Sequence, residues 1–173
     1  MKRHGAKLVS LAVLVASVFV SEPAAAAVGR TSSGQRPVLA ADVLVRLNVI
    51  RIQHARIPLK RSAKLTLAAS RHSSEMVADG YFAHESSDGS PFWRRVRRFY
   101  GRWPVGENLL SSTPGVGAGR AVEFWMASPG HRATMLDSEW REVGISAVHA
   151  AAAPGTYHGQ AVTVITADFG ARR

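Results

Sequence analysis

The hydrophobic pattern of this chain changes from helical spacing to strand spacing only near its C-terminus, and this change constrains the fold most. Residues 143–148 and 161–167 are rich in β-branched side chains, which is typical of strands. Residues 150–159 join them as a loop that contains Pro154 and Gly155, and its length suits an antiparallel hairpin. Helices come first and strands last, without βαβ alternation, so the sequence predicts an α+β domain built in layers.

Upstream of the strands, apolar side chains recur at helical spacing in four segments, residues 42–56, 63–79, 92–99 and 120–127. Ser128 and Pro129 end the last of these and are expected to begin a further helix, because Ser is a favoured N-cap and Pro a favoured first-turn residue. His72 falls on the apolar stripe of the second segment. We interpret it as a hydrogen-bonded core histidine rather than as a ligand.

The composition is that of one globular domain. The chain has 173 residues, of which 46% are hydrophobic and 20% are charged, enough for one domain with a real core but not comfortably for two. It contains no cysteine. This excludes disulfides, thiolate metal sites and a cysteine nucleophile, and in an exported protein it favours a bacterial envelope or extracellular setting.

The N-terminal segment has the three-part pattern of a secretory signal peptide, assigned to residues 1–27. Three basic residues lie within residues 1–7, an apolar and small-residue run covers 8–20, and Ala-x-Ala cleavage sites end at Ala26 or Ala27. The run is too short for a comfortable membrane span, although an uncleaved anchor is the alternative. We expect a secreted protein, located outside the cell or in its envelope, with no stable membrane span after cleavage.

Residues 28–41 are polar, contain Gly, Ser and Pro, and are expected to form a short flexible leader. The chain is strongly basic, with a formal net charge of +10. Residues 1–27 carry three Lys or Arg and one Glu, so the mature chain keeps +8. Such a charge favours anionic partners such as wall polymers or lipid head groups. No nucleic-acid motif is present, and no nucleic-acid partner is expected.

The densest group of positive charges is a short run of arginines. It consists of Arg94, Arg95, Arg97 and Arg98, in the segment predicted as a short helix. One interpretation is a binding surface for an anionic partner, and the simpler one is a solvated helix face.

Two side chains near the end of the helical region have an unusual setting. Glu123 lies within an apolar helical stretch, where a carboxylate is costly unless something partners it. His131 follows eight positions later, at the start of the next helix, and the break between the helices lets both side chains reach one cleft. A solvated Glu123 and a surface His131 are the simpler interpretation of the same spacing.

His84 and Glu107 are two further candidates. Tyr81 and Phe82 can anchor the loop that carries His84, and Gly106 permits a close backbone approach just before Glu107. The alternative for His84 is a loop histidine without a functional role, and the alternative for Glu107 is a turn carboxylate that is bonded to local amides.

A succession of short motifs resembles a known family. The motifs are Tyr-Phe-x-His (81–84), Gly-Glu-Asn (106–108), Ala-Val-Glu-x-Trp (121–125), Ser-Pro-Gly-His-Arg (128–132), Glu-Val-Gly-Ile (142–145) and Asp-Phe-Gly (168–170). This order resembles the CAP superfamily, which includes cysteine-rich secretory proteins, antigen 5 and plant pathogenesis-related 1 proteins. It is most similar to the cysteine-free, secreted bacterial branch. The resemblance covers residues 42–170 and leaves 171–173 as a short basic tail.

The resemblance implies a three-layer α-β-α sandwich, in which a small antiparallel sheet has helices on both sides. It also implies a central cleft with two histidines and two carboxylates, which by motif are His84, Glu107, Glu123 and His131. Arg132 follows the second histidine here, whereas plant and animal members have Gly-His-Tyr-Thr at that place. Vertebrate ligand or receptor functions are therefore not carried over.

Four such side chains in one cleft would suit a divalent cation. Imidazole and carboxylate groups bind Zn²⁺ and several other divalent ions, so we expect reversible binding with an exchangeable water. Without a metal, the carboxylates would raise the proton affinity of the histidines and make the cleft sensitive to pH.

Three classes of function remain open, for a protein expected to be a monomer. The first, favoured by the resemblance, is a binding module for a lipid, glycan, peptide or cell-wall component. The second is a peptidase-like hydrolase that uses His84 or His131 as general base and Ser86, Ser87 or a metal-bound water as nucleophile. Against it, Gly-x-Ser-x-Gly and His-Glu-x-x-His motifs are both missing. The third is a structural envelope domain with an inert cleft.

Overall fold

The fold is described from a computed structural model, which places residues 33–172. The predicted signal peptide, its cleavage site and residues 28–32 of the predicted leader lie outside the described residues. Within residues 33–172, no helix has the length and apolarity needed to cross a membrane.

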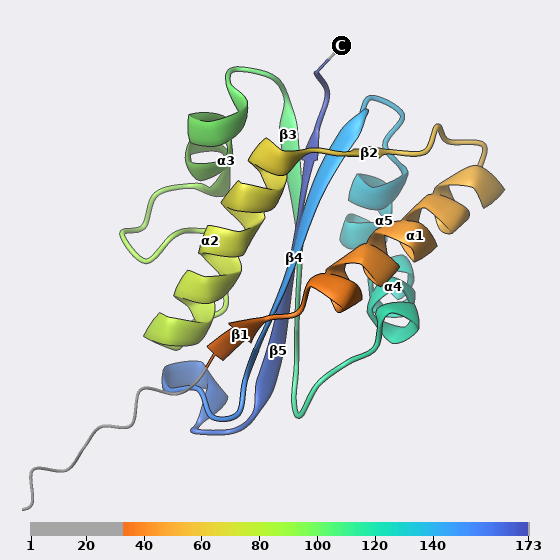
Figure 1. Ribbon diagram of the computed structural model, residues 1–173. Helices are drawn as coiled ribbons and strands as arrows, with labels where there is room; N and C mark the ends of the chain where they lie inside the picture. Colours follow the sequence, from red (N-terminus) through yellow and green to blue (C-terminus); the bar gives the residue numbers. More distant parts are fainter. Residues whose placement is uncertain (1–32, 173) are drawn as a thin grey trace, which may run out of the picture.

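One sheet forms the middle layer (Figure 1). Its strands are β1 (Ser33–Gln35), β2 (Lys60–Arg61), β3 (Val105–Ser112), β4 (Glu142–Ala150) and β5 (Val162–Gly170). The order is β1-β4-β5-β3, and antiparallel pairing joins each neighbour. The two-residue β2 pairs in parallel with β4, along the edge that β1 also uses. At the opposite side of the sheet, β3 is the edge strand.

Helices cover both faces of the sheet, which gives the α-β-α sandwich that the resemblance implies. The helices are α1 (Pro37–Gln53), α2 (Ala63–Asp79), α3 (Phe92–Tyr100), α4 (Ala118–Ala127) and α5 (Pro129–Leu136), with a 3-10 turn η1 (Gly155–Tyr157). Figure 1 shows α2 and α3 on one side of the sheet and α1, α4 and α5 on the other.

Each face of the sheet buries its own apolar core. Towards α1, α4 and α5, the core includes Leu47, Trp125, Met135 and Ile165. Towards α2 and α3, the buried apolar residues include Met76, Val77, Val148, Val164, Leu65 and Val96. Every residue of β5 is buried, because this central strand is covered on both faces. Its nearly continuous β-branched run follows from that position.

The element types predicted upstream and at the C-terminus are confirmed, including the β4–β5 hairpin. Gly80 ends α2 in the left-handed region with a φ of 72°, as suits a glycine at a helix C-terminus. Ser128 occupies the N-cap position of α5, but its side chain makes no capping hydrogen bond.

The predicted flexible leader is wrong for residues 33–41. Residues 33–35 form β1, which pairs with β4, and α1 begins at Pro37 instead of residue 42. Pro37 occupies the first turn of α1, where its fixed φ suits a helix start. The short polar strand β1 gives no hydrophobic signal in the sequence.

The first two residues of the predicted basic tail, residues 171–173, are bonded to the domain. The Ala171 N–H donates to the carbonyl of Pro104, and the Arg172 guanidinium pairs with Glu142 at 2.9 Å. Both residues are therefore fixed to the domain. The sequence also did not indicate β3, which carries a carboxylate and three uncharged polar residues among its apolar ones.

Gly144 sets how closely α2 approaches the sheet. A Cβ at this position of β4 would overlap the backbone of Leu65 and Thr66 in the first turns of α2. We predict that Gly144→Ala lowers the free energy of unfolding by at least about 1 kcal/mol, because the packed helix α2 has to shift. Chemical denaturation measures this change. Gly34→Ala is the matched control, since a Cβ there meets nothing within 4 Å; equal losses in both variants would contradict the prediction.

Candidate functional site

The candidate site is built on two neighbouring residues of the edge strand β3. Glu107 and Asn108 are both buried, and successive side chains of a strand point to opposite faces of the sheet. Glu107 contacts the loop before α3 on one side, whereas Asn108 contacts the start of α5 on the other. The Gly-Glu-Asn motif therefore connects the two helical layers at the edge of the sheet.

The carboxylate of Glu107 is held by two cationic or protonatable side chains. The His84 Nδ1 lies 2.8 Å from Oε1, and the Arg95 guanidinium donates to Oε2. The side chains of Glu107 and Arg95 are 0% and 8% exposed, whereas that of His84 is 46% exposed. The ion pair is therefore buried beneath the half-exposed ring of His84.

Asp168 is a second buried carboxyl group beside Glu107. The two residues are register partners on β5 and β3, and Asp168 is fully buried. Burial first, and the charge of Glu107 second, raise the pKa of Asp168 well above its ordinary value. Two adjacent carboxylates repel each other, but a protonated Asp168 can donate a hydrogen bond to Glu107. Among the described residues, neither oxygen of Asp168 has a hydrogen-bond partner, which favours the neutral, protonated form of this carboxyl group.

Three hydrogen bonds to backbone carbonyls fix the loop that carries His84. The Tyr157 hydroxyl donates to the carbonyl of Tyr81 at 2.8 Å. The fully buried His72 lies 2.9 Å from the carbonyl of Ala83, through Nε2, and Arg95 donates to the carbonyl of His84 itself. His72 is thus the hydrogen-bonded core histidine that was predicted. Burial first, and Arg95 second, lower its pKa and favour the neutral ring.

His131 lies at the start of α5, and Asn108 fixes its position. The Asn108 side-chain amide donates to the His131 carbonyl at 3.0 Å. Burial, and after it the charge of His84, lower the pKa of His131. In contrast, the hydrogen bond to Glu107 raises the pKa of His84 despite partial burial. Protonation is therefore favoured on His84 and disfavoured on His131.

The structure does not bring Glu123 to this site, and that part of the prediction is wrong. Its side chain is 66% exposed and pairs with Arg120 at 3.2 Å, one turn earlier in α4. It lines a groove between α1 and α4 together with Arg46 and Met126. The simpler interpretation holds here: Glu123 is a solvated carboxylate on the outer face of α4.

The predicted metal-ligand set is consequently not assembled. Within residues 33–172, no group of three or more His, Asp or Glu side chains is arranged to hold a metal ion. Both oxygens of Glu107 already accept hydrogen bonds, and Glu123 lies elsewhere. Two imidazoles alone do not fit the sites that Zn²⁺ usually occupies in proteins, which have three or four protein ligands.

Neither predicted nucleophile is bonded to a histidine. The Ser87 hydroxyl donates to Glu75, and the Ser86 hydroxyl accepts from Arg95 at 3.1 Å. The His84–Glu107 pair has the form of a base and its orienting carboxylate, but these two serines are engaged otherwise.

A pocket of about 450 Å³ lies next to His131. Its lining consists of four hydroxyl side chains, His131 and three apolar residues: Ser111, Ser112, Thr113, Ser128, Leu110, Phe124 and Trp125. Its lining contains no carboxylate.

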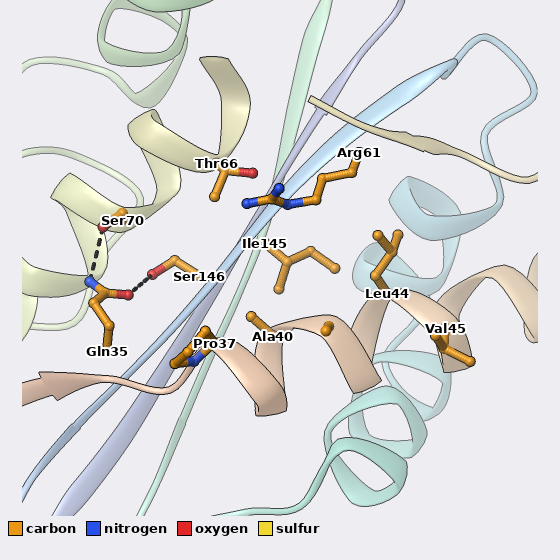
Figure 2. Close-up of a pocket in the computed structure, with 11 residues that line it drawn as sticks. Gln35, Pro37, Ala40, Leu44, Val45, Arg61, Thr66, Ser70, Ile145 and Ser146 are labelled. Atoms are coloured by element: carbon orange, nitrogen blue, oxygen red, sulfur yellow. Dashed lines mark hydrogen bonds between the residues drawn. The ribbon is translucent and has the colours of Figure 1, made fainter. Parts of the chain in front are cut away.

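A larger cavity, of about 640 Å³, lies at the β4 edge between α1 and α2 (Figure 2). Gln35 spans it, because its amide donates to Ser70 and accepts from Ser146. Arg61 is the one charged residue of its lining, and no predicted site residue lines it. The cavity therefore belongs to the junction of β1 with the helices rather than to the His84–Glu107 site.

Sequence analysis missed two members of the site, Arg95 and Asp168. Arg95 stood in a run of four arginines, and nothing in that run separates the buried one from the exposed ones. Asp168 carried a usable signal, because it is the one charged residue of an otherwise uncharged strand.

Comparisons with known proteins agree with the fold. The family model described as the cysteine-rich secretory protein family (CAP) matches residues 44–166. An uncharacterized membrane protein of Bacillus subtilis, YlbC, is 30% identical over 104 residues. The match covers 60% of this chain and 30% of that protein, so this chain corresponds to less than a third of that relative.

Solved structures of bacterial proteins share the architecture. An extracellular protein with an SCP domain from Bacillus anthracis superposes with a TM-score of 0.64 at 22% identity, covering 79% of this chain and 41% of that one. An outer surface protein from Borrelia burgdorferi gives 0.68 at 14% identity, covering 83% and 99%. A cysteine-rich secretory protein from Staphylococcus aureus gives 0.57 at 17% identity, covering 84% and 41%.

Glu107 and Glu123 form a matched pair for testing the site. We predict that Glu107→Gln lowers the free energy of unfolding by about 3–5 kcal/mol, because it leaves the buried Arg95 guanidinium without its counter-charge. It also shifts the titration of the His84 ring, followed by NMR, towards lower pH. Glu123→Gln changes neither quantity, since that carboxylate is exposed. Equal behaviour of the two variants would refute the assignment of Glu107.

Asp168 makes stability depend on pH. Its folded-state pKa is raised, so the folded chain holds a proton that the unfolded chain releases above its ordinary pKa of 3.8. Stability from this group is therefore lost as pH rises from about 4 towards the folded-state pKa. We predict that Asp168→Asn raises the melting temperature, relative to the unsubstituted protein, more at pH 7 than at pH 4. The exposed Asp42→Asn serves as control; a pH-independent effect of Asp168→Asn would contradict the prediction.

Proposed function

The chain belongs to the cysteine-rich secretory protein (CAP) family, and from that premise we propose that it is an exported bacterial binding module. Export is supported by the signal-peptide pattern of residues 1–27. It is further supported by the bacterial proteins of the same fold, one of which is described as extracellular and another as an outer surface protein.

The proposed ligand is a glycan, and the pocket beside His131 is the observation that carries this proposal. We call it the saccharide cleft. Four hydroxyl side chains line it, and a hydroxyl both donates and accepts, as the hydroxyls of a sugar do. Phe124, which is 42% exposed, adds an apolar surface for the C–H face of a sugar ring. This combination suits a saccharide better than a lipid tail or a charged peptide.

His84 and Glu107 support the cleft from outside its lining. A positive charge on His84 disfavours protonation of His131, and a neutral imidazole both donates and accepts hydrogen bonds. Glu107 stabilises that charge through its bond to His84. The site is thus expected to bind best when His84 is protonated and His131 is neutral.

Binding rather than turnover fits the side chains that are present. Hydrolysis of a glycosidic bond ordinarily needs two carboxyl groups that flank it, and none lines the saccharide cleft. A hydrolase remains the second candidate, since the His84–Glu107 pair resembles a general base with its orienting carboxylate. Its nucleophile would have to be a water, because Ser86 and Ser87 are engaged by Arg95 and Glu75.

The test is a calorimetric titration of the mature protein with soluble oligomers of N-acetylglucosamine, the sugar type of bacterial wall glycan. We predict saturable binding that Ser111→Ala/Ser128→Ala weakens by about fivefold to a hundredfold, as two lost neutral hydrogen bonds would.

The control is Ser138→Ala/Thr156→Ala, which removes two exposed hydroxyls elsewhere and should leave the affinity unchanged. Absence of binding by the unsubstituted protein, or an equal loss of affinity in both double variants, would contradict the proposal. Shortened oligomers in the mixture, detected by mass spectrometry, would favour the hydrolase instead.

A further inference from the structure

A second, basic pocket lies on the α2–α3 side of the molecule, and none of its residues lines the saccharide cleft. Its volume is about 400 Å³, which is within the range of small-molecule sites. The loop between α2 and α3 contributes serines, and the two helices contribute arginines. We call it the arginine pocket, and its defining residues are Arg71, Arg94, Arg98, Ser86, Ser87 and Ser90.

Three guanidinium groups of this pocket converge from two helices. Arg94 and Arg98 are four residues apart on α3 and so share one face of that helix. Arg71 comes from α2, and its guanidinium lies 5.1 Å from the ring centroid of Phe99 on α3. In the part of the chain that the structure describes, no carboxylate lies within 4.0 Å of any of these three guanidiniums. None of the three arginines therefore has an ion-pair partner within that part of the chain, and Glu75 and Asp88 are the two acidic residues of the lining.

The acidic residues of the same pocket are used to shape its loop. Glu75 accepts hydrogen bonds from the N–H and the hydroxyl of Ser87. Asp88 accepts from the N–H of Ser90 at 2.8 Å. Both carboxylates therefore order the serine-bearing loop rather than pair with the arginines. The simpler interpretation of the arginine run, a solvated helix face, holds for Arg97. Its guanidinium lies over the ring of Trp93.

We propose that the arginine pocket binds the phosphate group of a phosphodiester chain. Guanidinium groups present fixed donor pairs that match phosphate oxygens, and these charge-assisted bonds are stronger than neutral ones. The hydroxyls of Ser86 and Ser90 add neutral donors at the same pocket, whereas that of Ser87 already donates to Glu75. The net charge of +8 on the residues after position 27 draws a repeating anion to the surface. Such a phosphodiester occurs either in a soluble wall polymer or in the head group of a phospholipid.

Arg95 places this pocket next to the first site. It lines the arginine pocket and bonds Ser86, yet its charge is already paired with Glu107. The phosphate is therefore bound by the three outer arginines, and Arg95 holds the loop that supplies Ser86. A wall ligand that carries both sugar and phosphate would engage the two pockets with different residues.

The test measures binding to two phosphodiester probes at about physiological salt. One is soluble poly(glycerol phosphate), and the other is a vesicle of phosphatidylglycerol, compared with phosphatidylcholine vesicles. We predict that Arg94→Gln/Arg98→Gln weakens binding at least tenfold, which corresponds to about 1.4 kcal/mol. The matched control, Arg36→Gln/Arg46→Gln, removes the same charge from exposed positions at α1 and changes the affinity by less than about twofold.

Each outcome decides the proposal. Arginine-dependent binding of the soluble chain identifies a polymer, and arginine-dependent binding of the anionic vesicles alone identifies a lipid head group. Binding of neither probe overturns the proposal, as do equal losses in the two double variants or equally tight binding of poly-glutamate, which would show a response to net charge alone. The four substituted residues, Arg36, Arg46, Arg94 and Arg98, are all exposed. The melting curves of both double variants should therefore match that of the unsubstituted protein. The two pockets share no lining residue, so a failure of the glycan titration would not change the expected result of the phosphodiester test.

Discussion

The buried carboxylate of Glu107 is the interaction on which the rest of the site depends. It sits on an edge strand, beneath an exposed imidazole, and is bonded by Arg95 from α3 and by His84 from the preceding loop. A buried charge of this kind is stable only if it is fully partnered. The arrangement therefore fixes α3, the His84 loop and β3 relative to one another, and Asp168 extends it into the middle of the sheet.

The next residue, Asn108, performs the same task for the other layer. Its amide holds the carbonyl of His131 at the start of α5, so one dipeptide of β3 orients both helical layers. This explains how His84 and His131, which belong to different layers, come within electrostatic range of each other. It also explains why their proton affinities change in opposite directions, since only His84 has a carboxylate partner.

Much of the fold could be predicted from the sequence, because long periodic stretches report burial directly. The helices α2 to α5 and the β4–β5 hairpin follow from such stretches. The short strands β1 and β2 could not be predicted, since two or three polar residues pair only because β4 offers them a free edge. β3 was missed for a related reason: its buried polar residues, Glu107 and Asn108, interrupt the apolar pattern of a strand.

For the site, His84 and Glu107 are joined by a hydrogen bond, and His131 is held by Asn108, the next residue of the same strand. The prediction for Glu123 was wrong because its apolar neighbours were taken as a sign of burial. Phe124 beside it is itself 42% exposed. Arg95 and Asp168 were missed because their roles arise from tertiary packing. Nothing local distinguishes Arg95 from Arg94, yet of these two residues, which both line the arginine pocket, only Arg95 is paired with Glu107.

The most direct test of this account is the titration of the buried carboxyl group of Asp168. Carbon-13 NMR of the side-chain carboxyls, recorded as a function of pH, distinguishes a protonated group from an ionised one. The account predicts that Asp168 keeps its proton to a pH well above the range in which an exposed aspartate releases it. An Asp168 carboxyl that titrates in the ordinary range of an exposed aspartate would contradict it, and the proposed network around Glu107 would then have to be abandoned.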